Sequence, residues 1–357
     1  MNKILFTIII SILTHSCVFT QFSREPSWVK SSGKNISGYY VGFGSTTKKN
    51  LKDSEYIAKA NEAAFLDISN QINVNIYGET KTVLAERGDE LIDESEFTSE
   101  SSSLAELEGL IKENVWQSKE NYYVLWKLSK KEHKRNIDKY AKLAETYFEN
   151  ASNSVFSPVE ELGYLVKGYE SILRAHGKIV RVESQGRQVV LNSYFFSRIE
   201  EIISKISTRG INSSQNATFG KTPSAPLIFN AIYKDLVSKP ISGLPVKFVV
   251  TAGEIELDIN RSTDFEGNCS SLITEIKSDF PNQEIIALID LSVFKLNPAR
   301  NAFLDRKLEE ITKGRSTIYR IKVTQMVAEK IAVKIIGQEG LPAGEVDFIN
   351  EKFIAEL

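Results

Sequence analysis

Apolar and polar positions follow two different spacings along this chain, and each spacing predicts its own kind of element. Apolar residues recur at three- and four-residue intervals between 54 and 71, which is typical of an amphipathic helix, and Asp53 or Ser54 is a suitable cap. A glycine-punctuated strand at 38–44 precedes this helix, and an alternating strand at 72–77 follows it. A strand, a helix and a second strand therefore open the folded part of the chain.

The pattern predicts a first domain at 26–130. Small residues in its helix would let the helix lie close on a sheet, namely Ala58, Ala60, Ala63 and Ala64. Two strands at 107–116 and 122–128 are expected to form a hairpin around a turn at 117–121. The acidic, serine-rich stretch 87–103 reads as a mobile loop or as the frayed start of a long strand. Trp28 and Val29 are expected to dock on the sheet.

Helical spacing returns at 131–209, where we expect a helical segment. Its first two apolar stripes are separated by a break at Ser157-Pro158, and a third helix is expected at 194–206. The first stripe consists of Ile137, Tyr140, Ala141, Ala144, Tyr147 and Phe148. The second consists of Leu162, Leu165, Val166, Tyr169, Ile172 and Leu173.

A stretch rich in Ser, Asn, Gly and Pro at 210–226 is predicted to be a linker. Period-two spacing then dominates 227–293, which predicts a small β-sandwich. The expected strands are 228–233, 246–251, 253–260, 269–276 and 284–290.

The last part, 302–357, is predicted to be a short β-β-α unit after a helix at 302–313, with two strands within 318–336 and a helix at 347–357. Either this last helix packs back on the sheet, or the unit is incomplete. The expected fold class is thus a multidomain α+β protein. At 357 residues the chain is long enough for two or more domains.

The N-terminus carries the features of an export signal. Lys3 supplies a positive charge, and the apolar run 4–13 is too short to span a bilayer. Thr14 to Cys17 looks like a lipobox, which predicts a signal peptide at 1–16, a lipid on Cys17 and an exposed tether at 17–25. Cleavage near Gln21 is the alternative and would remove Cys17, while an uncleaved anchor lacks a stop-transfer flank.

Charge and cysteine content narrow the function classes. The net charge of −2 predicts no general attraction to nucleic acid or to anionic membranes. Cys269 is the second of two cysteines, so a chain lipidated on Cys17 cannot form an internal disulfide. No later stretch is apolar enough for a membrane span, which makes the lipid the expected anchor.

No catalytic, cofactor or metal site is predicted. Beyond the signal, the histidines are His133 and His176, both flanked by Lys or Arg and expected on solvated faces. These two and a single thiol do not supply a zinc site without carboxylates. Asp264, Glu266 and Asn268 have the spacing of a calcium loop, but its later bidentate Glu is missing, and a plain turn is favoured.

Other charged and aromatic groups also have a structural interpretation. Glu254, Glu256 and Asp258 line one face of a predicted strand and favour a solvated edge over a paired-carboxylate hydrolase. The glycines at 38–44 lack a Walker-type lysine. The basic run 130–135 is expected to be an exposed helix start, with acidic headgroups as a weaker alternative partner. The aromatic residues expected to be mostly core are Trp28, Tyr39, Tyr40, Trp116, Tyr122, Tyr123 and Trp126.

The first domain resembles the LPP-twenty lipoprotein family of bacterial outer-membrane and periplasmic proteins. The residues that carry this resemblance are Pro26, Trp28, Val29, the strand 39–44, the alanine-rich helix, the strand 72–76, and the hairpin with Trp116, Tyr122 and Tyr123. The resemblance covers about a third of the chain. It implies export, lipidation, one helix packed on a small antiparallel sheet, and no enzymatic activity.

The predicted sandwich resembles bacterial immunoglobulin-like domains through two segments. Pro240 to Val246 is similar to the stretch in which such domains enter a central strand, and Thr263 to Asn268 is similar to their acidic, glycine-bearing turn. Turn chemistry by itself is an alternative source of both similarities.

These observations predict a non-enzymatic lipoprotein of the cell envelope, exported by the general secretory route and anchored by its lipid in the outer membrane, with the cytoplasmic membrane as the alternative. It would act as a scaffold or binding module for envelope proteins or peptidoglycan. The alternatives are an exported carboxylate-dependent hydrolase and a self-associating subunit of a secretion or motility assembly. A cleft with two buried carboxylates would favour the hydrolase, and an open sheet face bearing aromatics would favour binding.

Overall fold

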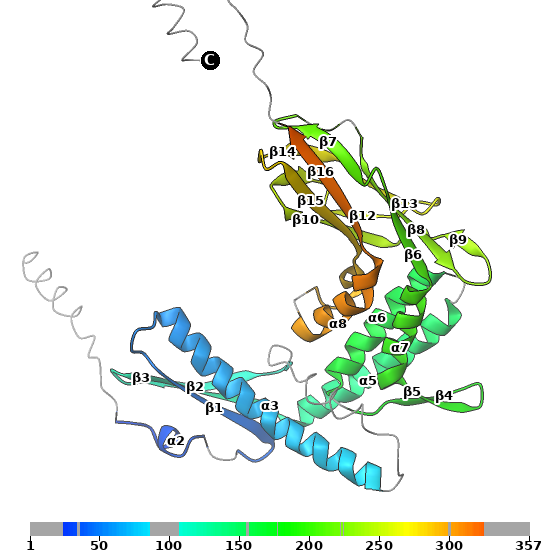
Figure 1. Cartoon of the computed structure of the whole chain (residues 1–357). Helices are drawn as coiled ribbons and strands as arrows, with labels where there is room; N and C mark the ends of the chain where they lie inside the picture. Colours follow the sequence, from blue (N-terminus) through cyan, green and yellow to red (C-terminus); the bar gives the residue numbers. More distant parts are fainter. Residues whose placement is uncertain are drawn as a thin grey trace, which may run out of the picture.

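The computed structural model describes residues 24–33, 36–85, 107–154, 157–176, 178–221, 223, 225–298 and 301–324, with side chains described up to residue 72 in the helix that ends at Ala85. Cys17 and the predicted signal peptide, the acidic stretch 87–103, and the elements predicted after 324 lie outside these residues. The described chain has a mixed α+β fold with several, mostly antiparallel, sheets (Figure 1). In this part of the chain no helix is both long and apolar enough to cross a membrane.

The N-terminal sheet has three antiparallel strands in the order β1–β3–β2. Their bounds are Tyr39–Thr47 for β1, Ile111–Gln117 for β2 and Asn121–Ser129 for β3. Helix α3 (Asp53–Ala85) covers one face of the sheet, and the short helix α2 (Ser27–Lys30) lies against the other (Figure 1). The predicted hairpin is confirmed as β2 and β3, which are paired from Ile111 to Gln117.

Helix α3 packs on the sheet through small and apolar side chains that repeat every four residues. This buried stripe consists of Tyr56, Ala60, Ala64, Ile68 and Ile72. On the facing strand, a Cβ atom at Gly42 would lie 2.0 Å from the carbonyl oxygen of Ala64. A Cβ atom at Gly44 would lie 1.8 Å from that of Ala60. Glycine is therefore required at both positions for the two backbones to approach this closely.

The predicted strand at 72–77 is wrong, because α3 continues through this stretch to Ala85. The alternation of Ile and Val with Asn favoured a strand, but Ile72 also extends the four-residue stripe of the helix. It is buried in one cluster with Ile68 and Leu128. Burial along α3 thus outweighs the weak strand preference of the β-branched residues.

Side chains of α3 also reach the outer edge of β1. The amide nitrogen Nε2 of Gln71 donates to the Val41 carbonyl at 2.7 Å, and its oxygen Oε1 accepts from the Val41 N–H at 3.4 Å. Asp67 accepts from the Phe43 N–H at 3.1 Å. Two positions along the edge of β1 are therefore hydrogen-bonded to a helix instead of to another strand.

Three helices follow the sheet, as the apolar stripes predicted. They are α5 (Lys130–Asn153), α6 (Pro158–Arg174) and α7 (Leu191–Ser204). Helix α5 continues directly from β3, and the hydroxyl of Ser129 caps it by accepting from the Glu132 N–H at 3.3 Å. Pro158 begins α6, so the predicted break is confirmed.

A β-hairpin that the apolar pattern does not predict lies between α6 and α7. Its strands are β4 (Arg181–Ser184) and β5 (Arg187–Val190). The two residues that join them, Gln185 and Gly186, both have positive φ, at 52° and 74°. This conformation suits a two-residue hairpin turn, but Gln is an unusual residue for it, and the turn was therefore not recognised.

The C-terminal half consists of two larger sheets and one small one. A five-stranded sheet has the order β12–β10–β15–β16–β7. A four-stranded sheet has the order β13–β8–β6, and its fourth strand, β9, also pairs with β8. The small sheet consists of β11 and β14. The strands are β6 (Ile206–Ile211), β7 (Ser214–Thr218), β8 (Leu227–Lys234), β9 (Ser238–Pro240), β10 (Pro245–Ala252), β11 (Ile255–Leu257), β12 (Asn260–Ser262), β13 (Asn268–Ser271), β14 (Ile273–Ile276), β15 (Asn282–Ile289) and β16 (Thr317–Thr324). Among the described strand pairs, the parallel pair is the one formed by β16 and β7.

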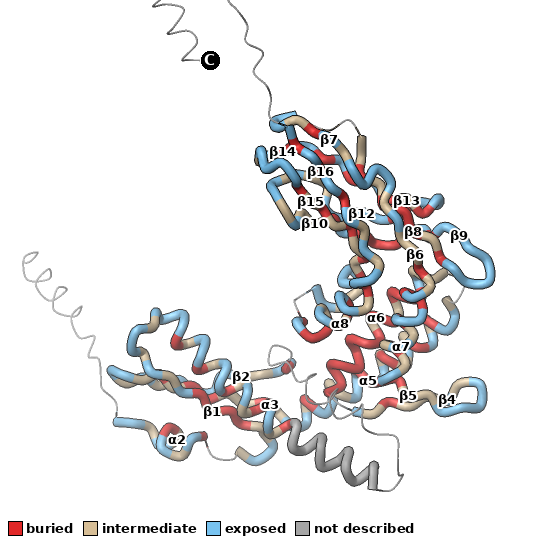
Figure 2. Tube along the Cα trace, in the orientation of Figure 1, coloured by how far each residue is buried: buried red, intermediate tan, exposed pale blue. Residues whose placement is uncertain are grey.

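Both larger sheets share one core with the helices. Buried side chains of α6, α7, β8, β10, β15 and β16 form a continuous cluster together with α8 (Ala302–Thr312). Figure 2 shows the buried residues running from the helices into the strands. The 3₁₀ helices η2 (Leu291–Phe294) and η3 (Lys313–Arg315) connect β15, α8 and β16.

The predicted linker at 210–226 is wrong in its first half. Strand β6 extends to Ile211 and pairs with β8, and β7 is an edge strand of the five-stranded sheet. Most side chains of β7 are not buried, with Ala217 as the exception, so its Ser, Asn and Gln residues face no apolar environment. The polar composition therefore indicated an edge strand and not a connection.

Other boundaries also differ from the prediction. The predicted strand 253–260 is divided into β11 and β12, and 269–276 is divided into β13 and β14, because the chain passes from one sheet to another at each break. The predicted helix at 302–313 is confirmed as α8. Strand β16 lies between β15 and β7, so it does not belong to a separate C-terminal unit.

We call α2, α3 and the sheet of β1, β2 and β3 the N-terminal module. We expect Gly44→Ala to lower the free energy of unfolding of this module by about 3 kcal/mol, because the added Cβ overpacks the contact between α3 and the sheet. All three tryptophans lie in this module, at 28, 116 and 126, so urea unfolding followed by tryptophan fluorescence reports on it selectively. Ser45→Ala, at the exposed neighbouring position of β1, is the matched control. Equal unfolding midpoints for the two variants would contradict the prediction.

We expect the thiol of Cys269 to be unreactive in the folded protein. Burial in β13 raises its pKa from 9.0 to about 12, which lowers the thiolate fraction about 1000-fold. Titration with a thiol reagent at pH 8 should detect Cys269 only after denaturation, measured in a Cys17→Ser background. In the same background Ser270→Cys, at the exposed neighbouring position, should react in the folded protein; a native Cys269 as fast as this control would overturn the expectation.

Candidate functional site

Four aromatic side chains form a continuous row on the face of the N-terminal sheet opposite α3. Trp28 of α2 lies 6.2 Å from Phe43 between ring centroids, Phe43 lies 6.1 Å from Tyr123, and Tyr123 lies 5.4 Å from Trp116. We call these four residues the aromatic face. One ring each comes from α2, β1, β2 and β3, so the geometry of the aromatic face depends on the N-terminal sheet and on α2 together.

The alternation along the strands places these rings. Gly42 and Gly44 face α3, so Phe43 between them faces the other way. Tyr122 and Val124 belong to the cluster under α3, so Tyr123 between them also lies on the opposite face. Trp116 of β2 is the cross-strand partner of Tyr123. Cross-strand aromatic pairs of this kind stabilise a sheet and hold each other's rings in place.

The aromatic face is partly open to solvent. None of its four residues is classed as buried, whereas Val29 and Leu125 beside them are buried. Lys127 lies on the same face, four residues along β3 from Tyr123, with its Nζ 2.5 Å from a Glu113 carboxylate oxygen and 5.1 Å from the centroid of the Tyr39 ring. This side of the sheet thus combines partly exposed rings with one charge pair.

The expectation that the aromatic residues are mostly core is therefore wrong for this face. Tyr122 is buried beneath α3, and Trp126 packs on the same side, where its indole N–H donates to Asn61 Oδ1 at 2.9 Å. Trp116 and Tyr123 had been expected in the core as well. They lie outside it because α3 covers a single face of the three-stranded sheet.

The expectation of solvated histidines is also wrong. His133 and His176 are both buried, and their ring centroids lie 5.2 Å apart. Burial lowers the pKa of each imidazole to about 4, so both are neutral at pH 7. Their Lys and Arg neighbours in the sequence gave no indication of burial. No group of three or more His, Cys, Asp or Glu side chains suited to a metal occurs among the described residues.

Two buried glutamates lie on α6, and each has a cationic partner. Glu161 accepts two hydrogen bonds from Arg198, at 2.6 and 3.2 Å. The resulting ion pair raises the pKa of Arg198. Glu170 is paired with Arg174 at 3.1 Å and accepts from the Leu296 N–H at 2.5 Å. The two glutamates are nine positions apart, which places them about 13 Å apart along the helix. They therefore do not face one another as a catalytic pair.

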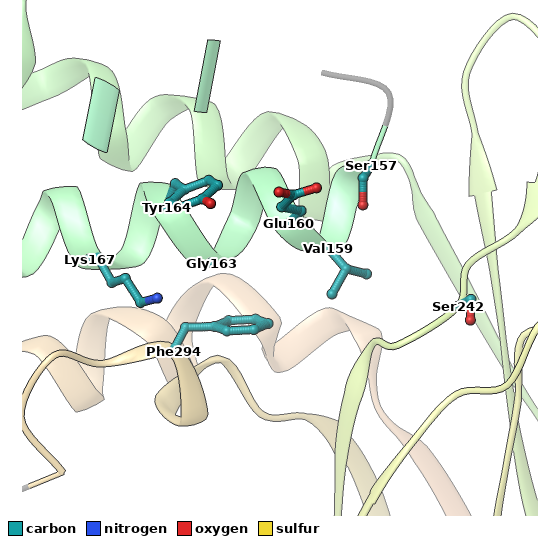
Figure 3. A pocket seen from close by; sticks show the side chains of 8 residues that line it. All are labelled: Ser157, Val159, Glu160, Gly163, Tyr164, Lys167, Ser242 and Phe294. Carbon is teal, nitrogen blue, oxygen red and sulfur yellow. The ribbon is translucent and has the colours of Figure 1, made fainter. Parts of the chain in front are cut away.

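A hollow of about 340 Å³ lies between α6, η2 and the loop before β10 (Figure 3). Its lining consists of Ser157, Val159, Glu160, Gly163, Tyr164, Lys167, Ser242 and Phe294. Phe294 lies 3.4 Å from where a Cβ of Gly163 would be, so glycine keeps this wall flat. Glu160 is exposed, and it is the carboxylate among the lining residues. The hollow therefore lacks the paired buried carboxylates of a hydrolase.

Most of the other acidic residues considered from the sequence have local partners, and Glu254 is exposed. Asp264 Oδ1 accepts from the N–H groups of Glu266 and Asn268, each at 2.9 Å, which confirms the turn interpretation of this segment. Glu256 is exposed and pairs with Lys277 at 2.5 Å. Asp258 is paired with Arg261. Cys17, the predicted lipidation site, lies outside the described residues.

The chain matches no protein-family profile and no curated protein sequence. Solved structures that are partly similar to it include the following three. A C. elegans member of the MSP family has a TM-score of 0.23 and 11% identity over 34% of this chain and 98% of that one. A domain of intimin has a TM-score of 0.17 and 17% identity over 23% of this chain and 38% of that one.

The third is a secreted protein of the human pathogen Helicobacter pylori, with a TM-score of 0.26 and 17% identity over 53% of this chain and 67% of that one. All three TM-scores are too low to support a shared fold or a shared function. The function of this chain has to be inferred from its own residues.

Proposed function

We propose that this protein is a non-enzymatic lipoprotein of the cell envelope that acts as a scaffold or binding module. The observation that carries the proposal is the aromatic face, a row of partly exposed rings on one side of a sheet whose other side is covered by α3. An export signal and a lipidated Cys17 would anchor the chain in the outer membrane after secretion by the general route.

The aromatic face has the properties of a binding surface. Rings present a large contact area with few rotatable bonds, and aromatic residues are enriched at the centres of protein interfaces. The contacts among the four rings limit their motion before a partner arrives. Lys127 and Glu113 at the side can give polar contacts and direction. Envelope proteins and peptidoglycan, whose sugar rings have apolar faces, are the partners we propose.

The fold supports two finer proposals. One helix on a small antiparallel sheet agrees with the arrangement implied by the LPP-twenty resemblance, although the 72–76 segment on which that resemblance partly depends is helical here. We propose membership of the N-terminal module in that family. We also propose that the two facing sheets of the C-terminal half are an immunoglobulin-like sandwich that presents or spaces the module.

The hydrolase alternative is less well supported by the described residues. The buried glutamates of α6 are separately paired with arginines, and the hollow beside α6 holds a single exposed carboxylate. A ring-forming assembly subunit remains the other alternative, and its mark would be self-association of the purified chain.

We expect the native protein from the membrane fraction to begin at Cys17 and to carry a diacylglycerol group. Intact mass spectrometry of the mature protein measures this directly. The matched variant Cys17→Ser should leave the membrane fraction and appear without a lipid. An unmodified N-terminus at or beyond Gln21 would contradict the proposed anchor.

We expect Trp116→Ala and Tyr123→Ala each to weaken partner binding at least tenfold, which corresponds to about 1.4 kcal/mol. Co-sedimentation with purified peptidoglycan, and in parallel with solubilised envelope proteins, identifies which class of partner responds. Phe265→Ala is the matched control, because Phe265 is 80% exposed on a turn of the sandwich, away from the aromatic face. Circular dichroism checks that the variants fold. Equal binding by all three would sink the aromatic face as the binding surface.

A further inference from the structure

His133 and His176 lie where the N-terminal sheet meets the helices. His133 is in the first turn of α5, which continues directly from β3, and His176 follows the end of α6. The His133 ring is 5.7 Å from the Tyr40 ring of β1 and nearly perpendicular to it, at 89°. On its other side it is 5.2 Å from the His176 ring. The two imidazoles therefore fill the joint between the sheet and the α5–α6 pair.

The joint accommodates neutral imidazoles and not charged ones. Nε2 of His133 and Nδ1 of His176 are buried and have no hydrogen-bond partner among the described residues. A protonated imidazole has N–H donors on both ring nitrogens, and a buried charge without acceptors is strongly unfavourable. The pKa of both residues is accordingly lowered to about 4, mainly by burial, and for His176 the neighbouring His133 and Arg174 contribute to this lowering.

The neighbouring charged groups do not neutralise the positive charge that a protonated histidine would add to that of Arg174. The titratable and charged groups on the elements that meet at the pair are Tyr40 of β1, Lys130, Glu132 and Tyr140 of α5, Glu170 and Arg174 of α6, and Glu108 before β2. Arg174 already engages Glu170 at 3.1 Å and Glu108 at 3.2 Å. Among the described residues no carboxylate forms an ion pair with either histidine, so protonation would add repulsion to a site that already holds Arg174.

We propose that the His133–His176 pair is an acid-sensitive joint, in which protonation loosens the contact between the N-terminal sheet and helices α5 and α6 while the C-terminal sheets stay folded. Opening of the joint would let the aromatic face change its orientation relative to the rest of the chain. The acid-sensitive joint concerns the contact between the N-terminal sheet and helices α5 and α6, so it does not require the proposed binding function.

The direction of the pH dependence follows from the two pKa values. In the closed joint the histidines have a pKa of about 4, and in an open joint they would return toward the ordinary 6.5. The open state therefore binds more protons between these values. The closed joint has its full stability above about pH 6.5 and loses it as the pH falls toward 4. At pH 5 each histidine should raise the ratio of open to closed joint by roughly 30-fold.

The full chain allows a direct test, because it contains three histidines and the third, His15, lies in the predicted signal peptide. NMR of histidine-labelled wild-type protein should show His133 and His176 titrating well below pH 6.5. Hydrogen exchange, corrected for the intrinsic rate at each pH, should show at least a tenfold loss of amide protection in 36–41 and 129–136 between pH 7 and pH 5. Protection of β10 and β15 should not change.

Two variants separate the histidines from other titrating groups. In the double variant His133→Phe with His176→Asn the joint should stay closed at pH 5; Asn tolerates the positive φ of 47° at position 176. The matched control is Asp138→Asn with Lys178→Gln, which removes an exposed ion pair of 2.6 Å between the same elements and should keep the pH response.

Any of three results would overturn the proposal. They are histidine pKa values near 6.5 in the wild type, pH-independent protection at the joint, and loss of protection in β10 and β15 together with the joint. If the double histidine variant does not fold, the wild-type titration and exchange data decide alone.

Discussion

The burial of helix α6 is the constraint on which most of the described structure depends. Twelve of its 17 residues are buried, and they include charged ones. Glu161 therefore needs Arg198 of α7, and Glu170 needs both Arg174 and the backbone N–H of Leu296. Removing one partner of a buried pair leaves an uncompensated charge and costs about 3–5 kcal/mol. These pairs consequently hold α7 and the segment after η2 in fixed positions against α6.

The sequence predicted those elements in which the spacing of apolar residues agrees with the burial of the side chains in the structure. Burial alternates cleanly along β15 and less regularly along β8 and β10, and all three strands were located within two residues. The stripes of α5 and α6 were recognised from their three- and four-residue spacing. The stretch 72–77 satisfied both a strand and a helix pattern, and tertiary burial of Ile72 decided between them. Strand β7 was missed because an edge strand needs few apolar residues. Neither ambiguity can be resolved without the neighbouring element.

The candidate site was predictable in part. Gly42 and Gly44 alternate along β1 and mark the side on which a helix lies close, so Phe43 and, by pairing, Tyr123 could have been placed on the other side. The number of helices that cover the sheet is not encoded in that pattern. His133 had no comparable signal, because its burial depends on the end of α6 meeting the sheet, which no local spacing reports.

The hydrogen bonds from Gln71 to Val41 have a consequence for solubility. The side-chain amide of Gln71 offers β1 the same donor and acceptor that a neighbouring strand would offer. A strand from another molecule would have to displace it, together with Asp67, before it could pair with β1. Edge-to-edge growth of a sheet from many copies requires two free strand edges on every copy. A helix side chain at one edge thus protects this small sheet from polymerising through that edge.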